Sequence, residues 1–427
     1  MDSFHYQDGN LHCEQVPAAR IAEELGTPVY IYSAATFQQH YQKLRQAFAE
    51  VDPLICYSVK VCGNLSVCRL LVEMGSGFDI VSGGELFRAL QAGGSAEKIV
   101  YAGVGKTDEE IRQAIDAGIA CFSVESEAEL GNIIRLARQC NTETRAALRV
   151  NPDVDPKTHR HTTTGKKGTK FGIDLERAMK VFKQYGHDKL VKLTGIHIHI
   201  GSPVNSTEPY VQAVTRILSF IDTLRAEGFT IDTLDIGGGF GADYTSGQAP
   251  LAANYAEAIV PLLRNKGLRL VIEPGRSIAA NAGILVTRVL YLKQGGDKTF
   301  AVVDTAMNDL IRPALYDAFH FIWPVKVAKE FEIERRLEPV QLAETKKFDI
   351  VGPICESADF LARNRLLPPL ARGDLLAVFT AGAYGFVMSS QYNARPRAAE
   401  VLVEHNRFRV IRRRETYEDL VALEREP

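Results

Sequence analysis

Short apolar stretches alternate with amphipathic ones between Leu54 and Gly275. Eight of the apolar stretches have the length and composition of buried strands, and most segments between them carry apolar residues at helical spacing. Eight strands that alternate with helices over about 220 residues are typical of a (β/α)8, TIM-like barrel. The predicted strands are Leu54–Lys60, Phe78–Ser82, Ile99–Gly103, Cys121–Glu125, Ala146–Asn151, Leu193–Ile200, Thr233–Ile236 and Leu268–Glu273.

Three of the predicted helices begin with a capping signature. In each, a hydroxyl residue is followed three positions later by glutamate, and both side chains can satisfy amide groups at the helix start. The pairs are Ser82 with Glu85, Thr107 with Glu110, and Ser126 with Glu129.

The pattern changes near residue 281, where strand-like stretches follow one another with few helical segments between them. We therefore predict an α/β barrel domain at 36–280 and a β domain, a sandwich or barrel, at 281–427 together with 1–35. The early stretch Pro28–Tyr32 is strand-like and makes the β domain discontinuous. The later predicted strands are Gly283–Lys293, Lys298–Asp304, Phe331–Ala343, Lys347–Pro353, Asp374–Ala381 and Ala399–Ile411.

One polar stretch, Asp155–Lys170, is too long for a routine connection between a strand and a helix. Two interpretations stay open: a surface loop, or a lid beside the active site.

The composition is that of a soluble globular enzyme, with 427 residues, 46% of them hydrophobic and 24% charged. A net charge of −2 without long runs of one sign argues against nucleic acid or an anionic membrane as partner. The N-terminus M-D-S-F-H-Y is unlike a secretory signal, and no apolar run approaches the ~20 residues that span a bilayer. Seven scattered cysteines predict free thiols in a reducing cytoplasm.

The unusual residues of the barrel segment fall at predicted carboxyl ends of strands, where barrel active sites lie. Lys60 is conspicuous because its neighbours in L-I-C-Y-S-V-K-V-C-G-N are mostly apolar. Partial burial disfavours an ammonium and leaves the amine free to attack an aldehyde. The other candidates are Asp79, His197, His199, Gly237, Gly238, Gly239, Glu273, Gly275 and Arg276.

The three glycines after strand seven and Arg276 after strand eight predict a phosphate site, because backbone amides can approach an anion there. Gly237-x-Gly239-x-x-Ala242 also matches a dinucleotide fingerprint. That fingerprint normally has an acidic residue about 20 positions later, whereas the next strand here ends much later, at Glu273. A tight turn without any ligand is a third interpretation.

A lysine amine and a phosphate site together suggest pyridoxal phosphate bound covalently to Lys60. Glu273 could keep the pyridine nitrogen protonated, His199 could stack on the ring, and Ser202 could donate to the phosphate. His197 and His199 share one strand face and also suggest a metal. No cysteine or carboxylate stands at ligand spacing beside them, so no metal is predicted.

Four motifs resemble the fold-type III pyridoxal-phosphate decarboxylases: Y-S-V-K-V-C-G-N, H-I-H-I-G-S, L-D-I-G-G-G-F-G and E-P-G-R. Within that group, the C-terminal half is similar to the diaminopimelate decarboxylases, through M-N-D-L-I-R-P-A-L-Y, V-G-P-I-C-E-S-A-D and A-G-A-Y-G-F-V-M-S-S-Q-Y-N-A-R-P-R. The early G-T-P-V-Y-I-Y also fits. The resemblance implies a carboxy-lyase that converts meso-2,6-diaminopimelate to L-lysine and carbon dioxide, the last step of lysine biosynthesis.

The resemblance implies that Lys60 binds the cofactor covalently, Asp79 lies near the ring, His199 stacks on it, and Glu273 pairs with its nitrogen. The phosphate region would be held by Gly237, Gly238, Gly239, Ser202, Gly275, Arg276 and Tyr384.

On the substrate side, the resemblance implies that Arg312 and Tyr316 bind the distal carboxylate and Glu356 the distal amine. Arg276 and Tyr384 would also contact substrate. Cys355 would donate a proton to Cα from the neighbouring subunit, which implies a homodimer with shared active sites. The alternative for Cys355, from composition alone, is an inert buried thiol. The alternative for Arg312, taken by itself, is a residue in a surface ion pair.

Three alternatives remain. A polyamine-type decarboxylase would share the fold and lack the need for Arg312. A catalytically inactive homologue would bind and regulate a partner, which the presence of Lys60 and Cys355 disfavours. A racemase of similar architecture would not need the C-E-S and R-P-A-L-Y motifs.

Overall fold

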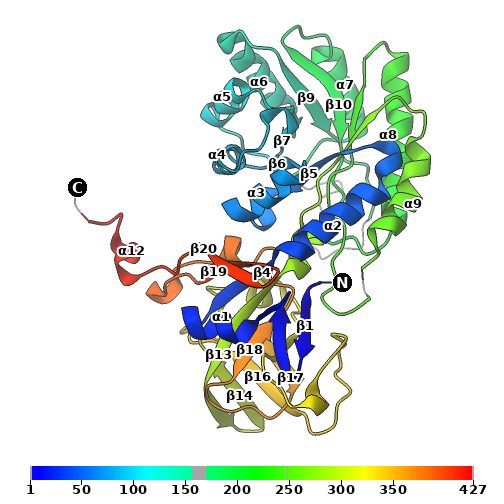
Figure 1. Ribbon diagram of the computed structural model, residues 1–427. Coiled ribbons are helices and arrows are strands. Elements are labelled where there is room, and N and C mark those ends of the chain that lie inside the picture. The colour runs from blue at the N-terminus through cyan, green and yellow to red at the C-terminus, as the bar shows by residue number, and fades with distance from the viewer. Residues whose placement is uncertain (1, 156–169, 248, 426–427) are drawn as a thin grey trace. The chain divides into compact units, whose positions relative to one another are not determined.

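The structure is a computed structural model that describes residues 2–155, 170–247 and 249–425. The chain divides into two compact units (Figure 1). The barrel unit contains residues 40–242 and 249–277, and the β unit contains 1–39, 243–248 and 278–427. The boundary near residue 40 falls within α2 (Ala34–Ala47).

The barrel unit contains a closed barrel of eight parallel strands in the order β10-β11-β12-β5-β6-β7-β8-β9, which confirms the predicted fold class. Its helices lie around the strands in Figure 1. The strands are β5 (Leu54–Ser58), β6 (Gly77–Ile80), β7 (Ile99–Tyr101), β8 (Cys121–Val124), β9 (Thr144–Arg149), β10 (Val191–His197), β11 (Thr233–Asp235) and β12 (Arg269–Ile272). The helices after α2 are α3 (Leu65–Glu73), α4 (Gly83–Gln91), α5 (Asp108–Ala117), α6 (Glu127–Cys140), α7 (Leu175–Tyr185), α8 (Glu208–Ala226), α9 (Ala252–Leu263) and α10 (Arg276–Ala279).

Helices α4, α5 and α6 begin at the predicted capping residues, because each hydroxyl accepts a hydrogen bond from the third amide of its helix. Of these three helices, α5 alone has the full reciprocal box, formed by Thr107 and Glu110. The carboxylate of Glu85 instead accepts from the amide of Val81 at 2.8 Å, one residue before the cap. At the start of α6, the carboxylate of Glu129 likewise accepts a hydrogen bond from the amide of Glu125, the residue before the cap.

The barrel interior is layered, and the layers follow from strand register. Cys56, Val100 and Val271 pack together in an apolar cluster. Cys56 and Ser58 are two residues apart on β5, so their side chains share a face, and Ser58 lies beside Asp79 of β6. A polar layer therefore follows the apolar one toward the carboxyl ends of the strands.

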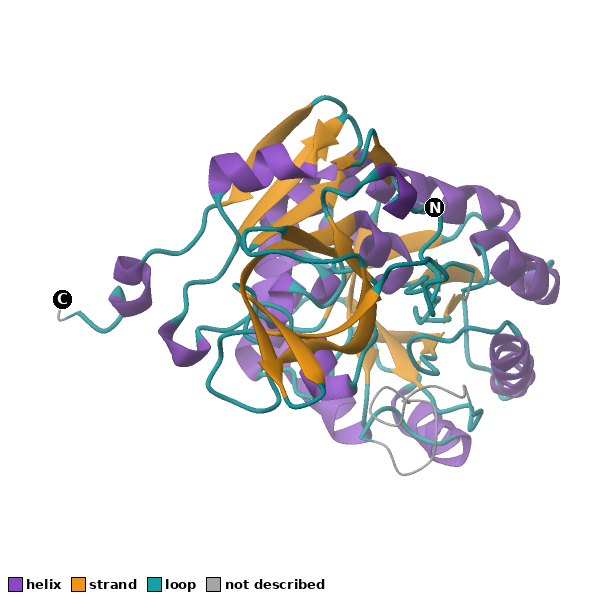
Figure 2. Ribbon diagram, turned by 90° about the horizontal axis from the view of Figure 1, so that it is seen from below, coloured by secondary structure: helices purple, strands orange, loops and turns teal. Residues whose placement is uncertain are grey.

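The β unit is built around a fully buried N-terminal strand, β4 (Val29–Ser33). It pairs in parallel with β19 (Ala399–Glu404) and antiparallel with β13 (Gly283–Gly295). The main sheet has the order β17-β16-β14-β13-β4-β19-β20, with β18 joining β13 to β15 (strands orange in Figure 2). The other elements of the unit are β1 (Phe4–Gln7), β2 (Asn10–Cys13), β3 (Val16–Pro17), α1 (Ala18–Leu25), β14 (Lys298–Val303), α11 (Arg312–Tyr316), β15 (Ile322–Pro324), β16 (Lys346–Val351), β17 (Phe360–Leu367), β18 (Leu375–Val378), β20 (Arg407–Arg412) and α12 (Tyr417–Val421).

The strand predicted at Phe331–Ala343 is wrong, since this segment holds only the end of a 3-10 turn, Lys329–Phe331, and no strand. Its alternating pattern does not bury a face, because Leu337 is 45% exposed. Pro339 also has no amide to offer a neighbouring strand.

Two other predictions in this unit need correction. Ala399–Ile411 is not one strand but the hairpin of β19 and β20, with His405 in the left-handed region at φ 58° in its turn. Strand β17 was not predicted, because charged residues interrupt its apolar pattern, and its pairing with β16 contains register shifts.

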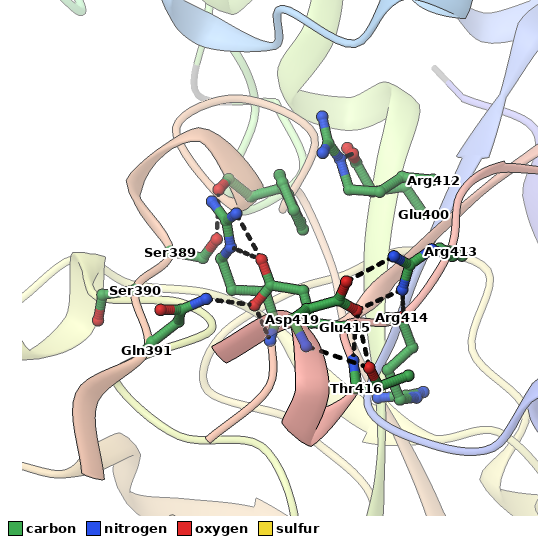
Figure 3. A network of polar contacts seen from close by, with 12 residues as sticks. Ser389, Ser390, Gln391, Glu400, Arg412, Arg413, Arg414, Glu415, Thr416 and Asp419 are labelled. Carbon is green, nitrogen blue, oxygen red and sulfur yellow. Dashed lines mark hydrogen bonds and ion pairs between the residues drawn. The ribbon is translucent and has the colours of Figure 1, made fainter. Parts of the chain in front are cut away.

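The end of the chain is held to the β unit by ion pairs (Figure 3). Arg413 Nη2 donates to Asp419 Oδ1 at 2.6 Å at the start of α12. Glu415 accepts from Arg397 Nε at 2.6 Å and from Gln391 Nε2 at 3.0 Å. Glu415 thereby ties the chain end to the Q-Y-N-A-R-P-R segment.

The predicted lid or surface loop at Asp155–Lys170 lies outside the described residues except at its two ends. Among the described helices, none combines the length and apolar character needed to cross a membrane.

Candidate active site

The carboxyl ends of β5 and β6 hold an amine and a carboxylate together. Strand β5 ends at Ser58 rather than at Lys60, which lies on a short 3-10 turn. Lys60 Nζ is 2.5 Å from Asp79 Oδ2, and Ser58 Oγ donates to the same oxygen at 2.7 Å. Burial raises the pKa of the Asp79 carboxyl, the charge of Glu273 raises it further, and Lys60 opposes both. The buried carboxylate accounts for an amine among apolar neighbours.

A second cluster comes from β10, β11 and the end of β12. Strand register places His197 beside Asp235, and Glu273 directly follows β12. His197 Nε2 is 3.6 Å from Glu273 Oε2, and one nitrogen or oxygen atom from each of the three residues lies within 4.8 Å of the others. All three side chains are buried. Asp235 was not predicted as a site residue, although its place before the glycine run was a usable signal.

The two carboxyl groups of this cluster, Glu273 and Asp235, differ in their pKa. Burial raises the pKa of Glu273, but its interactions with His197 and Lys60 outweigh burial, and the pKa lies below its ordinary value. Burial and the Glu273 charge raise the pKa of Asp235 well above its ordinary value. Glu273 is therefore the ionised carboxyl and Asp235 the protonated one. Glu273 Oε1 is buried and accepts no hydrogen bond from the described residues.

His197, Asp235 and Glu273 could also hold a metal ion. Local sequence spacing beside His197 and His199 offers no carboxylate or cysteine ligand, so these groups could not be foreseen from it. Closure of the barrel brings two carboxylates from other strands next to the histidine.

His199 lies two residues beyond the end of β10. Its Nδ1 accepts a hydrogen bond from the amide of Gly238 at 3.3 Å. Burial, followed by the charges of Arg149 and Lys60, lowers the pKa of His199 to about 3. The imidazole is therefore neutral near pH 7 and can stack its flat face on an aromatic ring.

Glycine is required at positions 237 to 239, because the backbone there has positive φ angles or packs directly against neighbouring backbone. Gly237 and Gly239 have φ of 68° and 92°. A Cβ on Gly239 would lie 2.2 Å from the carbonyl oxygen of Gly201, and a Cβ on Gly238 would lie 2.1 Å from that of Glu273. The dinucleotide alternative is wrong, because that fingerprint belongs to an open doubly wound sheet and this sheet is a closed barrel.

The loops after β10 and β12 meet at Ser202 and Arg276. Arg276 is 8% exposed, and its Nε donates to Ser202 Oγ at 3.2 Å. The backbone of Gly275, next to Arg276, packs against the end of β5 and the turn after it, since a Cβ there would lie 2.7 Å from Val61 Cγ1. These two predicted phosphate ligands therefore lie side by side.

A buried ion pair near His199 was missed. Arg149 Nη1 donates to Glu125 Oε1 at 2.5 Å, and the amide of Gly172 donates to Glu125 Oε2 at 2.8 Å. Glu125 and Arg149 lie at or just beyond the ends of neighbouring strands β8 and β9. That position was the signal that could have identified them.

Glu85, predicted only as a capping residue, also has a strongly shifted pKa. Burial raises the pKa of Glu85 to about 7, although the amide of Val81 and the charge of Lys60 lower it. The carboxyl therefore titrates near neutral pH close to the predicted cofactor lysine.

The remaining predicted site residues belong to the β unit. Arg312 begins α11 and is 7% exposed, so it is not the surface ion pair considered as an alternative. Its Nη1 is 2.8 Å from His320 Nε2, and its guanidinium lies 4.7 Å from the centre of the Tyr244 ring. Tyr316 ends the same helix.

Cys355 and Glu356 lie between β16 and β17. The Cys355 thiol is exposed, which contradicts the alternative of an inert buried thiol. Its amide donates to Asn393 Oδ1 at 2.9 Å, so the Q-Y-N-A-R-P-R segment positions this loop. Glu356 raises the pKa of the Tyr392 phenol. Tyr384 has φ 57°, a conformation that is rare for residues other than glycine and frequent at functional sites.

The chain matches known proteins over its whole length. The family described as pyridoxal-dependent decarboxylase, pyridoxal binding domain, matches residues 34–280. The diaminopimelate decarboxylase of Neisseria meningitidis serogroup A is 47% identical over 97% of this chain and 98% of its own length. That of Pseudomonas aeruginosa is 47% identical over 99% of this chain and 98% of its own.

Solved structures of diaminopimelate decarboxylases are also similar to this chain in fold and sequence. The diaminopimelate decarboxylase of Helicobacter pylori complexed with L-lysine has a TM-score of 0.88 at 38% identity, over 95% of this chain and 98% of that one. The enzyme of that name from M. jannaschii has a TM-score of 0.92 at 36% identity, over 100% and 98%. The lysine/ornithine decarboxylase of Vibrio vulnificus shares the fold, with a TM-score of 0.78 at 23% identity over 91% and 97%.

Proposed function

This chain belongs to the pyridoxal-dependent decarboxylases, and we propose that it is a carboxy-lyase that converts meso-2,6-diaminopimelate to L-lysine and carbon dioxide, the last step of lysine biosynthesis. The observation that carries the chemistry is the amine of Lys60 held at 2.5 Å by Asp79 at the carboxyl end of the barrel. The similarity to diaminopimelate decarboxylases, 47% over nearly the whole chain, supports the substrate.

The residues present fit pyridoxal phosphate. A protonated pyridine nitrogen needs an ionised, unsatisfied acceptor, and Glu273 Oε1 is a buried oxygen that accepts no hydrogen bond from the described residues. His199 offers a neutral flat ring. For the phosphate region we assign Ser202, Gly237, Gly238, Gly239, Gly275, Arg276 and Tyr384. The cofactor, when bound, supplies an aldehyde that reacts with amines and a ring that accepts the electrons of the breaking carbon–carbon bond.

The side chains of the barrel unit then have separate tasks. Lys60 is the residue to which the cofactor is covalently attached, and Asp79 holds its amine in place. Glu273 keeps a proton at the pyridine nitrogen, because its own carboxyl stays ionised. Ser58 orients Asp79 through its hydroxyl.

The β unit carries the residues that would recognise the rest of the substrate. Arg312 and Tyr316 bind the distal carboxylate, Glu356 binds the distal amine, and Arg276 and Tyr384 also contact substrate. A substrate without the distal carboxylate would lose its charge-assisted hydrogen bonds to the buried guanidinium of Arg312, which we expect to cost several kcal/mol, on the order of 10²-fold or more in selectivity.

We further propose that Cys355 donates the proton to Cα, and that it does so in the active site of a second copy of the chain, in a homodimer with shared sites. An exposed thiol next to Glu356 supports this assignment. A cytoplasmic location is also proposed, since all seven cysteines are free thiols.

The direct test is to incubate the purified protein with pyridoxal phosphate and meso-diaminopimelate and to measure carbon dioxide and L-lysine. We expect both products in equal amounts, and none from Lys60→Ala. A protein that turns over ornithine or lysine in preference would support the polyamine-type alternative. A protein that binds no cofactor would support the inactive regulator, and interconversion of stereoisomers without carbon dioxide would support the racemase.

A further inference from the structure

The proposed carboxylate ligand, Arg312, is held by two side chains with no assigned role. His320, completely buried, lies 2.8 Å from Arg312 Nη1 through its Nε2. Tyr244 lies under the guanidinium at 4.7 Å and meets the His320 ring edge-on, with ring centres 5.6 Å apart at 83°. All three residues belong to the β unit.

Tyr244 reaches this cluster from a segment that follows the glycine run in sequence but belongs to the β unit. The carbonyl oxygen of Asp243 accepts a hydrogen bond from Asn281 Nδ2 at 2.7 Å. The amide of Ser246 donates to the carbonyl oxygen of Arg336 at 2.9 Å. Tyr244 is thus held on both sides by short contacts within its own unit.

The partners of His320 determine its tautomer. Its Nδ1 is 2.9 Å from the carbonyl oxygen of Phe379, which can only accept, so Nδ1 carries the proton. A guanidinium can only donate, so the Nε2 that faces Arg312 carries none. His320 is therefore a neutral acceptor toward Arg312, with its orientation set by the backbone of the residue after β18.

We propose that His320 and Tyr244 are positioning residues that orient Arg312 for the distal carboxylate of the substrate. The inference rests on the proposed function. One N–H of the guanidinium is occupied by His320, and the ring of Tyr244 covers one of its faces. The plane of the guanidinium is thereby fixed, which sets the direction from which a carboxylate can approach it for two-point binding.

The test compares two ligands that differ only in that carboxylate. L-lysine retains the distal carboxylate of diaminopimelate, and cadaverine is the same chain without it. Dissociation constants of both are measured by calorimetry on the holoenzyme, for the wild type, His320→Leu, His320→Gln, Tyr244→Leu and Tyr244→Phe.

We expect His320→Leu and Tyr244→Leu to weaken L-lysine binding by about tenfold and cadaverine binding by less than about twofold. The conservative His320→Gln keeps an acceptor for Arg312, and Tyr244→Phe keeps the ring. Both should retain most of the preference for L-lysine. If His320→Leu fails to fold, the two Tyr244 variants give the same comparison.

Equal weakening of both ligands, or of neither, in the Leu variants would overturn the inference while the wild-type preference for L-lysine leaves the proposed function intact. A wild-type protein that binds cadaverine as tightly as L-lysine would overturn the proposed substrate and this inference with it.

Discussion

The amine of Lys60 and the carboxylate of Asp79 lie 2.5 Å apart at the carboxyl ends of two adjacent barrel strands, with the carboxylate completely buried. Strand register produces this contact, because Ser58 of β5 pairs directly with Asp79 of β6 and Lys60 follows two residues later. The amine of Lys60 is thus oriented by a carboxyl group whose own position the barrel sets.

Asp79→Asn should lower kcat by about 10²-fold, because the substituted amide cannot stabilise the charged amine of Lys60. Turnover of meso-diaminopimelate at saturating cofactor is the measurement. Ser58→Ala is the matched control, since it removes another hydrogen bond to the same oxygen without removing charge. Equal losses in the two variants would mean that the charge of Asp79 is not needed.

Glu273→Gln should lower kcat by about 10²–10³-fold, because a neutral amide cannot hold a proton on the pyridine nitrogen. Cofactor binding, followed by its absorbance, should persist. Asp235→Asn is the comparison: this carboxyl is already protonated, and an amide oxygen can still accept from the amide of Gly237. A larger loss in Asp235→Asn than in Glu273→Gln would contradict the assigned ionisation.

Arg312→Ala should reduce kcat/KM for meso-diaminopimelate by roughly 10²-fold or more, while any slow turnover of ornithine, which lacks a distal carboxylate, stays within about twofold. Steady-state kinetics with the two substrates provide the comparison. Arg363→Ala, at an exposed position of β17, serves as a control that should behave as the wild type. If diaminopimelate turnover survives in Arg312→Ala, the polyamine-type alternative gains support.

Lys60→Ala and Cys355→Ala should each be inactive alone but regain up to about a quarter of wild-type activity when their subunits are mixed and reassociated. Random pairing makes half of the dimers mixed, and each mixed dimer has one intact site. Sedimentation shows whether dimers form. Mixed dimers without activity would show that Cys355 acts within its own chain.

Glu85 should make the protein less stable as pH rises toward neutrality. Its pKa in the folded state is raised from 4.5 to about 7, so the folded state binds the proton more tightly than the unfolded state does. The associated stability is present below pH 4.5 and is lost between about pH 4.5 and 7, on the order of 3 kcal/mol. Urea unfolding across this range measures it, and Glu85→Gln should flatten the dependence. A wild-type curve that is already flat would refute the assignment.

Several features were predictable from the chain alone. The places of the eight barrel strands and the helix starts follow from local periodicity and capping, as Thr107 with Glu110 illustrates, although the predicted strands run one to three residues past the observed ends. The strand-end candidates Lys60, Asp79 and Glu273 were identified because a barrel places its site at carboxyl ends of strands. Strand β17 was not predicted, because charged residues interrupt its apolar pattern. A strand was wrongly predicted at Phe331–Ala343, because apolar and polar residues alternate there although the segment is largely exposed.

The sequence by itself determined the order of strands and helices, the eight-stranded barrel and the types of side chain available for amine and phosphate chemistry. The tertiary structure alone decided which distant groups meet: His197 with Asp235 and Glu273, Arg149 with Glu125, and His320 with Arg312. The physical reason is that periodicity depends on neighbours three or four residues away, whereas charge, tautomer and pKa depend on groups brought close in space by strand register and barrel closure.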